Sequence, residues 1–522
     1  MLGYLSFLLY NLNMRKLVSV SEMKAIEKAS DAAGHSYAKM MSKAGESLAS
    51  IIAAHSHSVG KSILGLIGPG NNGGDALVAL RLLAKGGWKA SALIVGKRAK
   101  EDKLLGQAQK AGVRILASRK ALEMAVARSG VVLDGLLGTG IRLPLKEPYS
   151  AVLAQVEAVI ASRPKPPLVV AVDCPSGMDC ESGQLAPQTL KTDLTITMAA
   201  VKRGMLTLPA FEYLGRLEVG DIGLPQVLAE WAAIRRLAID EDLARSALPS
   251  RPLDAHKGTF GTALIAAGSQ RFPGAVLLAG ESAYRSGTGL VTLAAPKGLQ
   301  TALAAGLPEA TWLPLPQEYG SISASAAELV SQNLDRVTAM LLGPGFGQDA
   351  GPGKFLLQLL EAPLPPLVVD ADGLKLLAGI EDWQRRLPEG SVLTPHPGEM
   401  AILTGLTIEK IQARRIEYAE EYAQAWKQIV VLKGAFTVVA APDGRTGVLP
   451  LVSPALARAG TGDVLAGLIT GLRAQGVAAF DAACAAVWLH GQAGLRAAAR
   501  LGGTAGVLAG DLISEIPALI AK

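Results

Sequence analysis

The chain has few of the residues on which several classes of protein depend. Aromatic residues make up 4 % of its 522 residues, whereas proteins that bind nucleic acids by base stacking rely on aromatic platforms. The three cysteines, Cys174, Cys180 and Cys484, lack the spacing of a zinc site and are too few for a disulfide framework. We therefore expect reduced thiols, a cytoplasmic location and no nucleic-acid partner.

Long apolar runs are also missing. The first thirteen residues, MLGYLSFLLYNLN, are apolar but shorter than the roughly 20 residues that a membrane-spanning helix needs. They lack the basic start and the small-residue cleavage site of a signal peptide. We interpret residues 1–13 as an extension or a misplaced start, because Met14 begins a more ordinary sequence. Later apolar stretches are interrupted by Gly, Pro and charges, so no membrane partner is expected.

Concentrated charge is absent as well. The net charge of +6 is spread over the whole chain without a block of Lys or Arg, which is typical of a solvated surface rather than a polyanion-binding track. Hydrophobic residues make up 50 % of the chain and there are 58 glycines, a globular composition. A chain of this length is expected to form two or three domains.

Short apolar strands alternate with glycine-rich turns and amphipathic helices in two stretches of the chain. A helical start from Ser21 to about His55, interrupted near Gly34, precedes the first stretch. The alternation predicts βαβ units and mostly parallel sheets, buried on both faces because the strands are nearly continuous Val, Ile and Leu. In the first half we predict strands over 62–68, 89–96, 131–134, 168–173 and 192–198, and a helix over 75–87.

The alternation stops between about residues 225 and 258, where prolines and charges occur without an obvious strand. It restarts at Gly261, with a helix from about Gly274 and a long helix from Thr461. We interpret the interruption as the join between two α/β domains. Because the turn motifs of the two halves differ, we expect two different domains rather than a duplication. The strands predicted in the second half are TALIAAG, GLVTLAA, TAMLLG, PLVVD, SVLT and IVVLKG.

The segment GPGNNGGD (68–75) follows a predicted strand and precedes a helix. Gly68, Gly70 and Gly73 satisfy G-x-G-x-x-G, but the second strand does not end in the acidic residue that a dinucleotide fingerprint requires. The Gly-Lys-Ser/Thr of a P-loop is also missing. Glycines let the backbone approach a ligand closely, and helix N-terminal amides favour phosphate. The segment is therefore either a ligand-binding turn or only a tight connection from strand to helix.

Two further glycine-rich segments, DGLLGTG (134–140) and VDCPSGMD (172–179), place an aspartate at the end of a predicted strand. Ligands of open α/β sheets bind at the carboxyl ends of the strands. One such aspartate could simply cap a helix. Three polar, glycine-rich strand ends in one domain favour a binding site.

Together, NNGGDA, DGLLGTG and VDCPSG resemble the N-terminal domain of the YjeF family, the NAD(P)H-hydrate epimerases, from about Val18 to Pro225. The resemblance implies a Rossmann-like, doubly wound domain over 14–232, with Asp173 as the catalytic acid/base. Such a carboxylate can shuttle the proton while a hydroxyl moves between the faces of one ring carbon. Ala76 and Cys174 depart from the family pattern without removing a functional group.

The resemblance implies a potassium ion bound by Asn72, Asp134 and Ser176. The implied substrate contacts are Asn71, Asn72, Gly73, Gly74, Asp75, Gly138, Thr139, Gly140, Ile141, Arg142, Leu143 and Pro144.

In the second half, AGTGDVLAGLITGL (459–472) is a glycine-rich turn that leads into a helix. Free amides at such a helix start would neutralise charge on a transferred phosphoryl group, and Asp463 in the first turn could take a proton from an attacking hydroxyl. The alternative is an acid that only interacts with the helix dipole, worth about 0.3–1 kcal/mol. That alternative leaves Gly460, Gly462 and Gly467 unexplained.

Four other strand ends carry polar or glycine-rich segments. His396 lies between two prolines in LTPHPGEM (393–400), and this rigid loop favours a ligand contact over the structural role that a lone His usually has. Lys433 ends the buried strand of VVLKGAFT (430–437) and needs an anionic partner, which a nucleotide phosphate could supply. The glycine-rich segments are LLGPGFG (341–347) and GSQRFPGA (268–275).

This second set resembles the C-terminal domain of the YjeF family, the ADP/ATP-dependent NAD(P)H-hydrate dehydratases, from about Asp254 to near Leu512. The resemblance implies a ribokinase-like α/β domain over 240–522, with Asp463 as the catalytic base and magnesium bridging the nucleotide phosphates. Ser453 stands where the family usually has Asn, which weakens one contact. The implied hydrate contacts are Ala275, Gly345, His396 and Asp463, and the implied nucleotide contacts are Lys433, Gly434, Ala435, Phe436, Thr437 and Gly462.

The two resemblances imply a bifunctional enzyme that repairs hydrated NADH and NADPH. The epimerase would interconvert the R and S hydrates, and the dehydratase would use ADP to return the S hydrate to NAD(P)H, giving AMP and phosphate. The alternative is a ribokinase-like small-molecule kinase fused to a non-catalytic dinucleotide-binding module, which leaves the three N-terminal motifs unexplained. The expected partners are the hydrates and ADP, and the chain is expected to form a homo-oligomer. These motifs do not distinguish NADH from NADPH hydrates or ADP from ATP.

Overall fold

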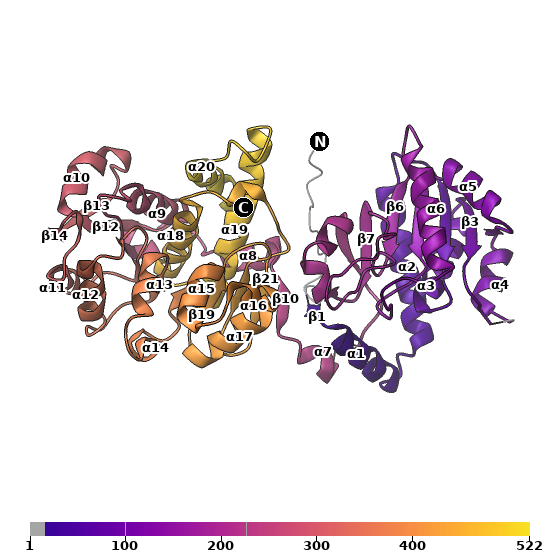
Figure 1. Cartoon of the computed structure of the whole chain (residues 1–522), viewed down its shortest axis with the longest axis horizontal. Coiled ribbons are helices and arrows are strands. Elements are labelled where there is room, and N and C mark those ends of the chain that lie inside the picture. The colour runs from indigo at the N-terminus through magenta and orange to yellow at the C-terminus, as the bar shows by residue number, and fades with distance from the viewer. Residues whose placement is uncertain (1–15, 100, 226, 522) are drawn as a thin grey trace. The chain divides into compact units, whose positions relative to one another are not determined.

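The computed structural model describes residues 16–99, 101–225 and 227–521, and the chain divides into two compact units, Met1–Ala238 and Ile239–Lys522 (Figure 1). The apolar segment 1–13 lies outside the described residues. Within the described residues, no helix combines the length and the apolar character needed to cross a membrane. Cys174, Cys180 and Cys484 are buried free thiols.

After the two-residue strand β1 (Leu17–Val18), unit 1 continues with two helices, α1 (Val20–Ala32) and α2 (Tyr37–His55), so the predicted interruption near Gly34 is confirmed. Helix α1 starts at a capping box: the Glu22 amide donates to Ser19 Oγ at 3.0 Å, and the Ser19 amide donates to Glu22 Oε2 at 2.7 Å. Gly34 lies in the connection between the two helices with φ of +89°, a left-handed conformation that favours glycine.

Seven described strands of unit 1 form a sheet in the order β4-β3-β2-β5-β6-β7-β9, in which every pairing is parallel, and β1 pairs separately with β8 (Val201–Lys202). Alternate residues face opposite sides, so Ile63 packs into one hydrophobic cluster and Leu64 into another. The strands are β2 (Ser62–Ile67), β3 (Lys89–Ile94), β4 (Arg114–Ile115), β5 (Val131–Gly135), β6 (Leu168–Val172), β7 (Leu194–Met198) and β9 (Arg216–Gly220). The helices between them are α3 (Asn71–Lys85), α4 (Lys103–Lys110), α5 (Arg119–Arg128) and α6 (Tyr149–Ala161).

The strand order reverses between β2 and β5, which is where open α/β sheets bind ligands. The chain turns from β2 at Gly68, whose amide donates to Gly135 O at 3.1 Å. A Cβ on Gly68 would lie 1.7 Å from Leu136 O, so only glycine fits there. The Rossmann-like doubly wound fold is therefore confirmed for unit 1.

Helix α3 begins at Asn71, four residues before the predicted start at Asp75. The prediction was wrong because glycine disfavours helices, and NNGGD was therefore assigned to the preceding turn. In the structure, close packing accounts for these glycines: a Cβ on Gly73 would lie 2.1 Å from Gly68 O, and one on Gly74 would lie 2.7 Å from Met41 Sδ.

Unit 2 contains a second sheet in the order β21-β20-β19-β18-β17-β16-β11-β12-β13, parallel from β19 to β13. The last two pairings, β19 with β20 and β20 with β21, are antiparallel and were not predicted. The strands are β11 (Thr262–Ala266), β12 (Leu290–Pro296), β13 (Thr311–Leu315), β16 (Ala339–Leu342), β17 (Leu367–Val369), β18 (Val392–Leu393), β19 (Ile429–Leu432), β20 (Val438–Ala440) and β21 (Thr446–Val448).

Helices of unit 2 cover this sheet. One hydrophobic core joins its strands to α9 (Gly274–Arg285), α18 (Thr461–Ala474), α19 (Ala479–Arg500) and α20 (Ala509–Ile520). The starts predicted for α9 and α18 are confirmed. The other helices include α12 (Ala350–Leu359), α13 (Asp372–Leu377), α15 (Pro397–Thr404) and α17 (Arg415–Trp426).

The segment predicted to lack strands, 225–258, contains three short elements. They are α7 (Ala229–Ala232), β10 (Arg236–Ala238) and α8 (Glu241–Ala247). The prediction of no strand was wrong because a three-residue strand has no detectable periodicity. Helix α8 has a local signal, since Asp240 Oδ1 accepts the Leu243 amide at 2.9 Å as an N-cap.

Candidate active sites

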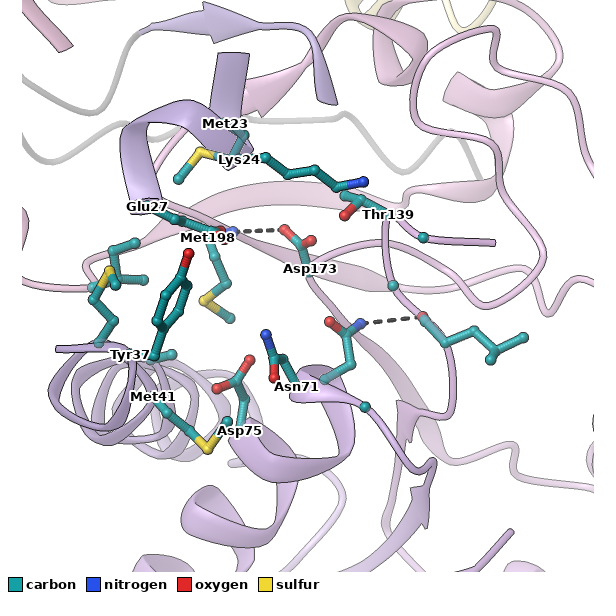
Figure 2. A pocket seen from close by; sticks show the side chains of 18 of the residues that line it. Met23, Lys24, Glu27, Tyr37, Met41, Asn71, Asp75, Thr139, Asp173 and Met198 are labelled. Atoms are coloured by element: carbon teal, nitrogen blue, oxygen red, sulfur yellow. Dashed lines mark hydrogen bonds between the residues drawn. The ribbon is translucent and has the colours of Figure 1, made fainter. Parts of the chain in front are cut away.

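Unit 1 has a cavity of about 410 Å³ at the carboxyl edge of its sheet (Figure 2). It is lined by α1, α2, the start of α3, the loop after β5, and Asp173. Asn71, Asn72 and Asp75 reach this lining, whereas Gly73 and Gly74 pack behind it. Among the predicted substrate contacts after β5, Gly138, Thr139, Gly140 and Ile141 line the cavity, and Arg142, Leu143 and Pro144 continue beyond it.

Asp173 follows β6 and is held by an ion pair. Its Oδ1 accepts the Thr197 hydroxyl at 3.1 Å and the Met198 amide at 3.0 Å, and the Lys202 ammonium donates to the same oxygen. Lys202 is 1 % exposed and also donates to Thr197 Oγ1 and Met198 O, each at 2.9 Å. The backbone of Asp173 has φ of +64°, an uncommon conformation for a non-glycine residue at a functional strand end. The cavity thus contains one fixed carboxylate with its own buried cation.

Asp75 and Glu27 bring two further carboxyl groups to the cavity. Burial raises the pKa of Asp75 well above its usual range, and the charges of Asp173 and Glu27 add to the shift while Lys202 opposes it. Burial also raises the pKa of Glu27. The charge of Lys202 opposes this rise, and the charge of Asp173 adds to it. The protonated form is therefore favoured at Asp75 beside an ion-paired carboxylate at Asp173.

The three residues predicted to bind potassium belong to one hydrogen-bonded network. Ser176 donates to Asp134 through its hydroxyl at 2.6 Å and through its amide at 2.8 Å. The Asn72 amide group donates to Leu137 O at 3.1 Å and to Val172 O at 2.7 Å. Burial raises the pKa of Asp134, and the groups that lower it are uncharged hydrogen-bond donors. The network therefore combines a buried carboxylate with a hydroxyl, an amide and main-chain carbonyl groups.

Unit 2 brings two predicted hydrate contacts together at the point where its strand order reverses, between β11 and β16. The Gly268 amide after β11 donates to Pro344 O after β16 at 2.8 Å. Gly345 has φ of +67°, and a Cβ on it would lie 3.0 Å from the Ala275 Cβ. Gly345 therefore keeps its backbone close to the start of α9.

Lys433, at the end of β19, has a protein carboxylate as its partner. Its Nζ lies 2.5 Å from Asp370 Oδ1 and 3.8 Å from Glu399 Oε2. Asp370 follows β17, and its Oδ1 also accepts the Thr394 hydroxyl at 2.7 Å. The Asp370 Oδ2 is buried without a hydrogen-bond partner among the described residues. The expected anionic partner of Lys433 thus exists within the protein.

Asp463 lies in the first turn of α18, near Lys433. Burial raises its pKa to about 7, with the charges of Asp370 and Asp372 adding and that of Lys433 opposing. Gly462 lies beside the same lysine, since a Cβ on it would be 3.6 Å from Lys433 Nζ. The arrangement gives a carboxyl group that changes its charge near neutral pH, next to a cation and a helix N-terminus.

His396 caps the start of α15: its Nδ1 accepts the Gly398 amide at 2.9 Å and the Glu399 amide at 3.2 Å. Burial lowers the His396 pKa, although Glu399 opposes the shift. The other ring nitrogen, Nε2, lies 3.2 Å from Glu399 Oε1, so both ring nitrogens have partners within the protein. The side chain of His396 is 51 % exposed.

The predicted nucleotide loop, Lys433 to Thr437, follows β19. Its start is fixed by the Lys433 amide, which donates to Pro395 O at 2.9 Å, and by the Arg415 guanidinium, which donates to Leu432 O at 2.9 Å. Its end is fixed by the Thr437 hydroxyl, which donates to Gly434 O at 2.9 Å. Of the remaining loop residues, Ala435 is exposed and Phe436 is buried with φ of +53°.

Comparison with known proteins gives matches over both units. A family model described as YjeF-related protein N-terminus matches residues 37–204, and one described as NAD(P)H-hydrate dehydratase matches residues 263–518. The bifunctional NAD(P)H-hydrate repair enzyme Nnr of Moorella thermoacetica is 36 % identical over 474 residues, covering 88 % of this chain and 87 % of its own length. The chain belongs to the bifunctional NAD(P)H-hydrate repair enzyme family.

Other members of the repair enzyme family match over a similar length. The Gloeobacter violaceus enzyme is 38 % identical, and the match covers 93 % of this chain and 94 % of that enzyme. The Escherichia coli enzyme is 34 % identical, and the match covers 94 % of this chain and 91 % of that enzyme. One similar solved structure is the crystal structure of the ADP/ATP-dependent NAD(P)H-hydrate dehydratase from Bacillus subtilis, co-crystallised with ATP and Mg²⁺. Its sequence is 33 % identical, and the match covers 54 % of this chain and 96 % of the Bacillus subtilis chain, with a TM-score of 0.46.

The sequence analysis did not single out four residues that lie at the two sites of this repair enzyme. Asp370 carried a usable signal, because it directly follows an apolar strand as Asp173 does. Lys202 follows strand β7 by four residues and has no motif of its own. Glu27 and Lys24 lie on α1, which precedes the matched family model and is amphipathic like an ordinary surface helix.

Proposed function

We propose that this chain repairs hydrated NADH and NADPH, with an epimerase over 14–232 and an ADP-dependent dehydratase over 240–522. The observation that carries the proposal is that its similarity to bifunctional repair enzymes extends over both units, each of which has an acidic site at the switch point of its sheet. The kinase alternative does not account for the Asp173–Lys202 pair or for the cavity around it.

In the epimerase half, Asp173 is the catalytic acid/base. Hydration of an enamine double bond places the hydroxyl on the carbon bonded to nitrogen, so the R and S hydrates differ at that ring carbon. A carboxylate beside this carbon can move the proton that inversion requires. The loop from Gly138 to Pro144 would contact the dinucleotide phosphates, and the residues from Asn71 to Asp75 would border the rest of the substrate.

Potassium is the proposed cofactor of the epimerase half, and the residues present fit it. Asn72, Asp134 and Ser176 would hold the ion, and their oxygen atoms are the hard donors that such cations prefer. Among the described residues, the groups that donate hydrogen bonds to the buried Asp134 carboxylate are uncharged, so a cation would stabilise its ionised form. When bound, the ion would supply fixed positive charge beside the substrate.

In the dehydratase half, Asp463 is the catalytic base and the nucleotide enters as its magnesium complex. Asp463 would accept the proton of the S-hydrate hydroxyl while that oxygen attacks the terminal phosphorus of ADP and AMP leaves. Loss of phosphate from the ring carbon and of a proton from the neighbouring carbon then restores the double bond of NAD(P)H. Lys433 and the amides at the start of α18 would stabilise the phosphoryl charge. Ala275, Gly345 and His396 would contact the hydrate, and Gly434, Ala435, Phe436, Thr437 and Gly462 would contact the nucleotide.

The direct test is to incubate the protein with hydrated NADH, magnesium and either ADP or ATP, and to follow the return of NADH absorbance. We expect recovery that requires nucleotide and releases phosphate in equal amount. A kinase fused to a binding module would not restore NADH absorbance, and that result would exclude the proposal.

A further inference from the structure

Two carboxyl groups with different partners face the same cavity of unit 1. Figure 2 shows Asp75 projecting from α3 and Asp173 projecting from the end of β6. Asp173 is ion-paired with the buried Lys202. Asp75 is 7 % exposed, and no described residue hydrogen-bonds to its carboxyl group. One carboxyl group is therefore held in an ion pair, and the other is left free to bond to a ligand in the cavity.

We propose that Asp75 and Asp173 act as a general acid and a general base on opposite faces of the hydrated ring. This proposal rests on the epimerase function proposed above. It makes Asp75 a second catalytic residue, in place of the substrate contact that the family resemblance implies.

The chemistry follows from the hydroxyl-bearing carbon, which is also bonded to the ring nitrogen. Asp75 gives its proton to the hydroxyl, the carbon–oxygen bond breaks, water leaves, and the nitrogen lone pair forms an iminium. A water molecule on the other face then adds to the same carbon and gives a proton to Asp173, and the electron pair returns to nitrogen. The net result is an inverted hydroxyl with one proton moved from Asp75 to Asp173. Two acids in opposite protonation states are what such a step needs.

The surrounding charges favour the return of both acids to their starting forms. Protonation of Asp173 leaves the buried ammonium of Lys202 without its partner anion, which favours release of that proton once the product has left. Ionisation of Asp75 places a buried negative charge near Asp173 and Glu27, which favours uptake of a proton from cavity water. Lys24 from α1 and Tyr37 from α2 are the other ionisable groups in the cavity lining.

A measurement on the unmodified protein tests the water exchange. The protein is incubated with one hydrate epimer in water enriched in ¹⁸O, without nucleotide, and the oxygen content of both epimers is measured by mass spectrometry. After subtraction of the spontaneous exchange, we expect one solvent oxygen for each inversion. Inversion with retained oxygen would overturn the proposal. No inversion at all would instead contradict the epimerase function itself.

Variants test the identity of the acid. We expect Asp75→Asn to lower the epimerisation kcat by at least about 100-fold, the usual range for a general acid. Glu157→Gln, an exposed carboxyl on α6 outside the cavity lining, is the matched control and should keep the wild-type rate. Glu27→Gln should lose less activity than Asp75→Asn. A larger loss in Glu27→Gln than in Asp75→Asn would move the acid role to Glu27 and overturn the assignment.

Discussion

A largely buried lysine lies next to an aspartate at each proposed site, but the two lysines are used differently. Lys202 pairs with Asp173, the proposed catalytic residue itself. Lys433 pairs with Asp370 instead, at 2.5 Å, and only partly offsets the burial of Asp463. Asp463 therefore has its pKa raised to about 7, whereas Asp173 is fixed by an ion pair. In the first site the lysine thus pairs with the proposed catalytic aspartate itself. In the second site the lysine pairs with another aspartate and leaves the proposed base with a raised pKa.

The titration of Asp463 predicts the pH dependence of dehydration. A base acts only when ionised, and the raised pKa means that Asp463 becomes protonated as the pH falls through about 7. The dehydration kcat should therefore fall by about tenfold per pH unit on the acid side of this pKa. A pH profile of S-hydrate dehydration with saturating nucleotide measures this limb, and a flat profile between pH 5 and 8 would contradict the role.

Replacing the base gives a separate prediction. Asp463→Asn keeps the size of the side chain but cannot accept the hydroxyl proton, so dehydration should fall by at least about 100-fold. Nucleotide binding, measured by calorimetry, should change little, because the predicted nucleotide contacts are in other residues. Near-normal turnover in this variant would remove Asp463 from the mechanism.

Residue-level inference from the sequence depended on local patterns. Asp173 and Asp463 were singled out because one follows a buried strand and the other lies in the first turn of a helix after a glycine-rich turn, and the structure places both at those positions. Their catalytic roles stay predictions. Lys202 could not be found in this way, because its importance depends on contact with a residue 29 positions earlier. Lys433 was singled out as a cation that needs an anionic partner, but the sequence could not identify Asp370, 63 positions away, as that partner.

At the scale of elements, the strands that position the sites were largely predictable. Parallel strands buried on both faces have apolar runs bounded by glycine, so the runs at β2, β5, β6 and β19 were assigned within about two residues. The three-residue strands β10, β20 and β21 were missed, because their pairing depends on distant partners rather than on periodicity. We predicted the start of α3 four residues too late. The glycines in its first turn were interpreted as a turn, whereas in the structure they allow close packing.

The turn from β2 to α3 gives a stability prediction with a matched control. Gly68→Ala should be strongly destabilising, by about 3 kcal/mol or more, because the added Cβ would lie 1.7 Å from the Leu136 carbonyl oxygen. Gly70→Ala adds the same atom two residues later, where nothing lies within 4 Å. Thermal unfolding of both variants measures the difference. Equal melting temperatures would show that the turn relaxes without cost.

Helix α1 gives a binding prediction. Figure 2 shows Lys24 extending toward Thr139, in the loop proposed to contact the dinucleotide phosphates. Lys24→Ala should raise the epimerisation KM by about three- to tenfold with little change in kcat, because the lost charge contacts the bound substrate and not the reacting carbon. Lys28→Ala, on the same helix but outside the cavity lining, is the control. Equal KM values for the two variants would exclude a phosphate contact by Lys24.

At the scale of the whole molecule, two units with different sites serve one substrate pool. The dehydratase is proposed to accept only the S hydrate, so the R hydrate is repaired only after epimerisation. Each site is built entirely within its own unit, at the switch point of its own sheet. A change confined to one site should therefore alter one step of the sequence and leave the other step intact.

The last prediction separates these two steps with Asp173→Ala. With a mixture of R and S hydrates, magnesium and ADP, this variant should consume the S hydrate at the normal rate and then slow to the spontaneous rate of epimerisation, because the R hydrate is no longer converted. The wild-type protein should consume both epimers in one continuous phase. Chromatographic separation of the two epimers during the reaction measures each one directly.

Two companion variants make this result specific to the Asp173 carboxylate. Asp173→Asn preserves the shape of the buried side chain and should show the same two phases, which separates loss of the carboxylate from disruption of the packing around Lys202. Asp463→Asn should give the reverse behaviour: the epimers reach equilibrium, but neither is dehydrated. If Asp173→Ala and Asp173→Asn both consumed the R hydrate at the wild-type rate, Asp173 would have no catalytic role in epimerisation, and its role as general base would pass to another group in the cavity.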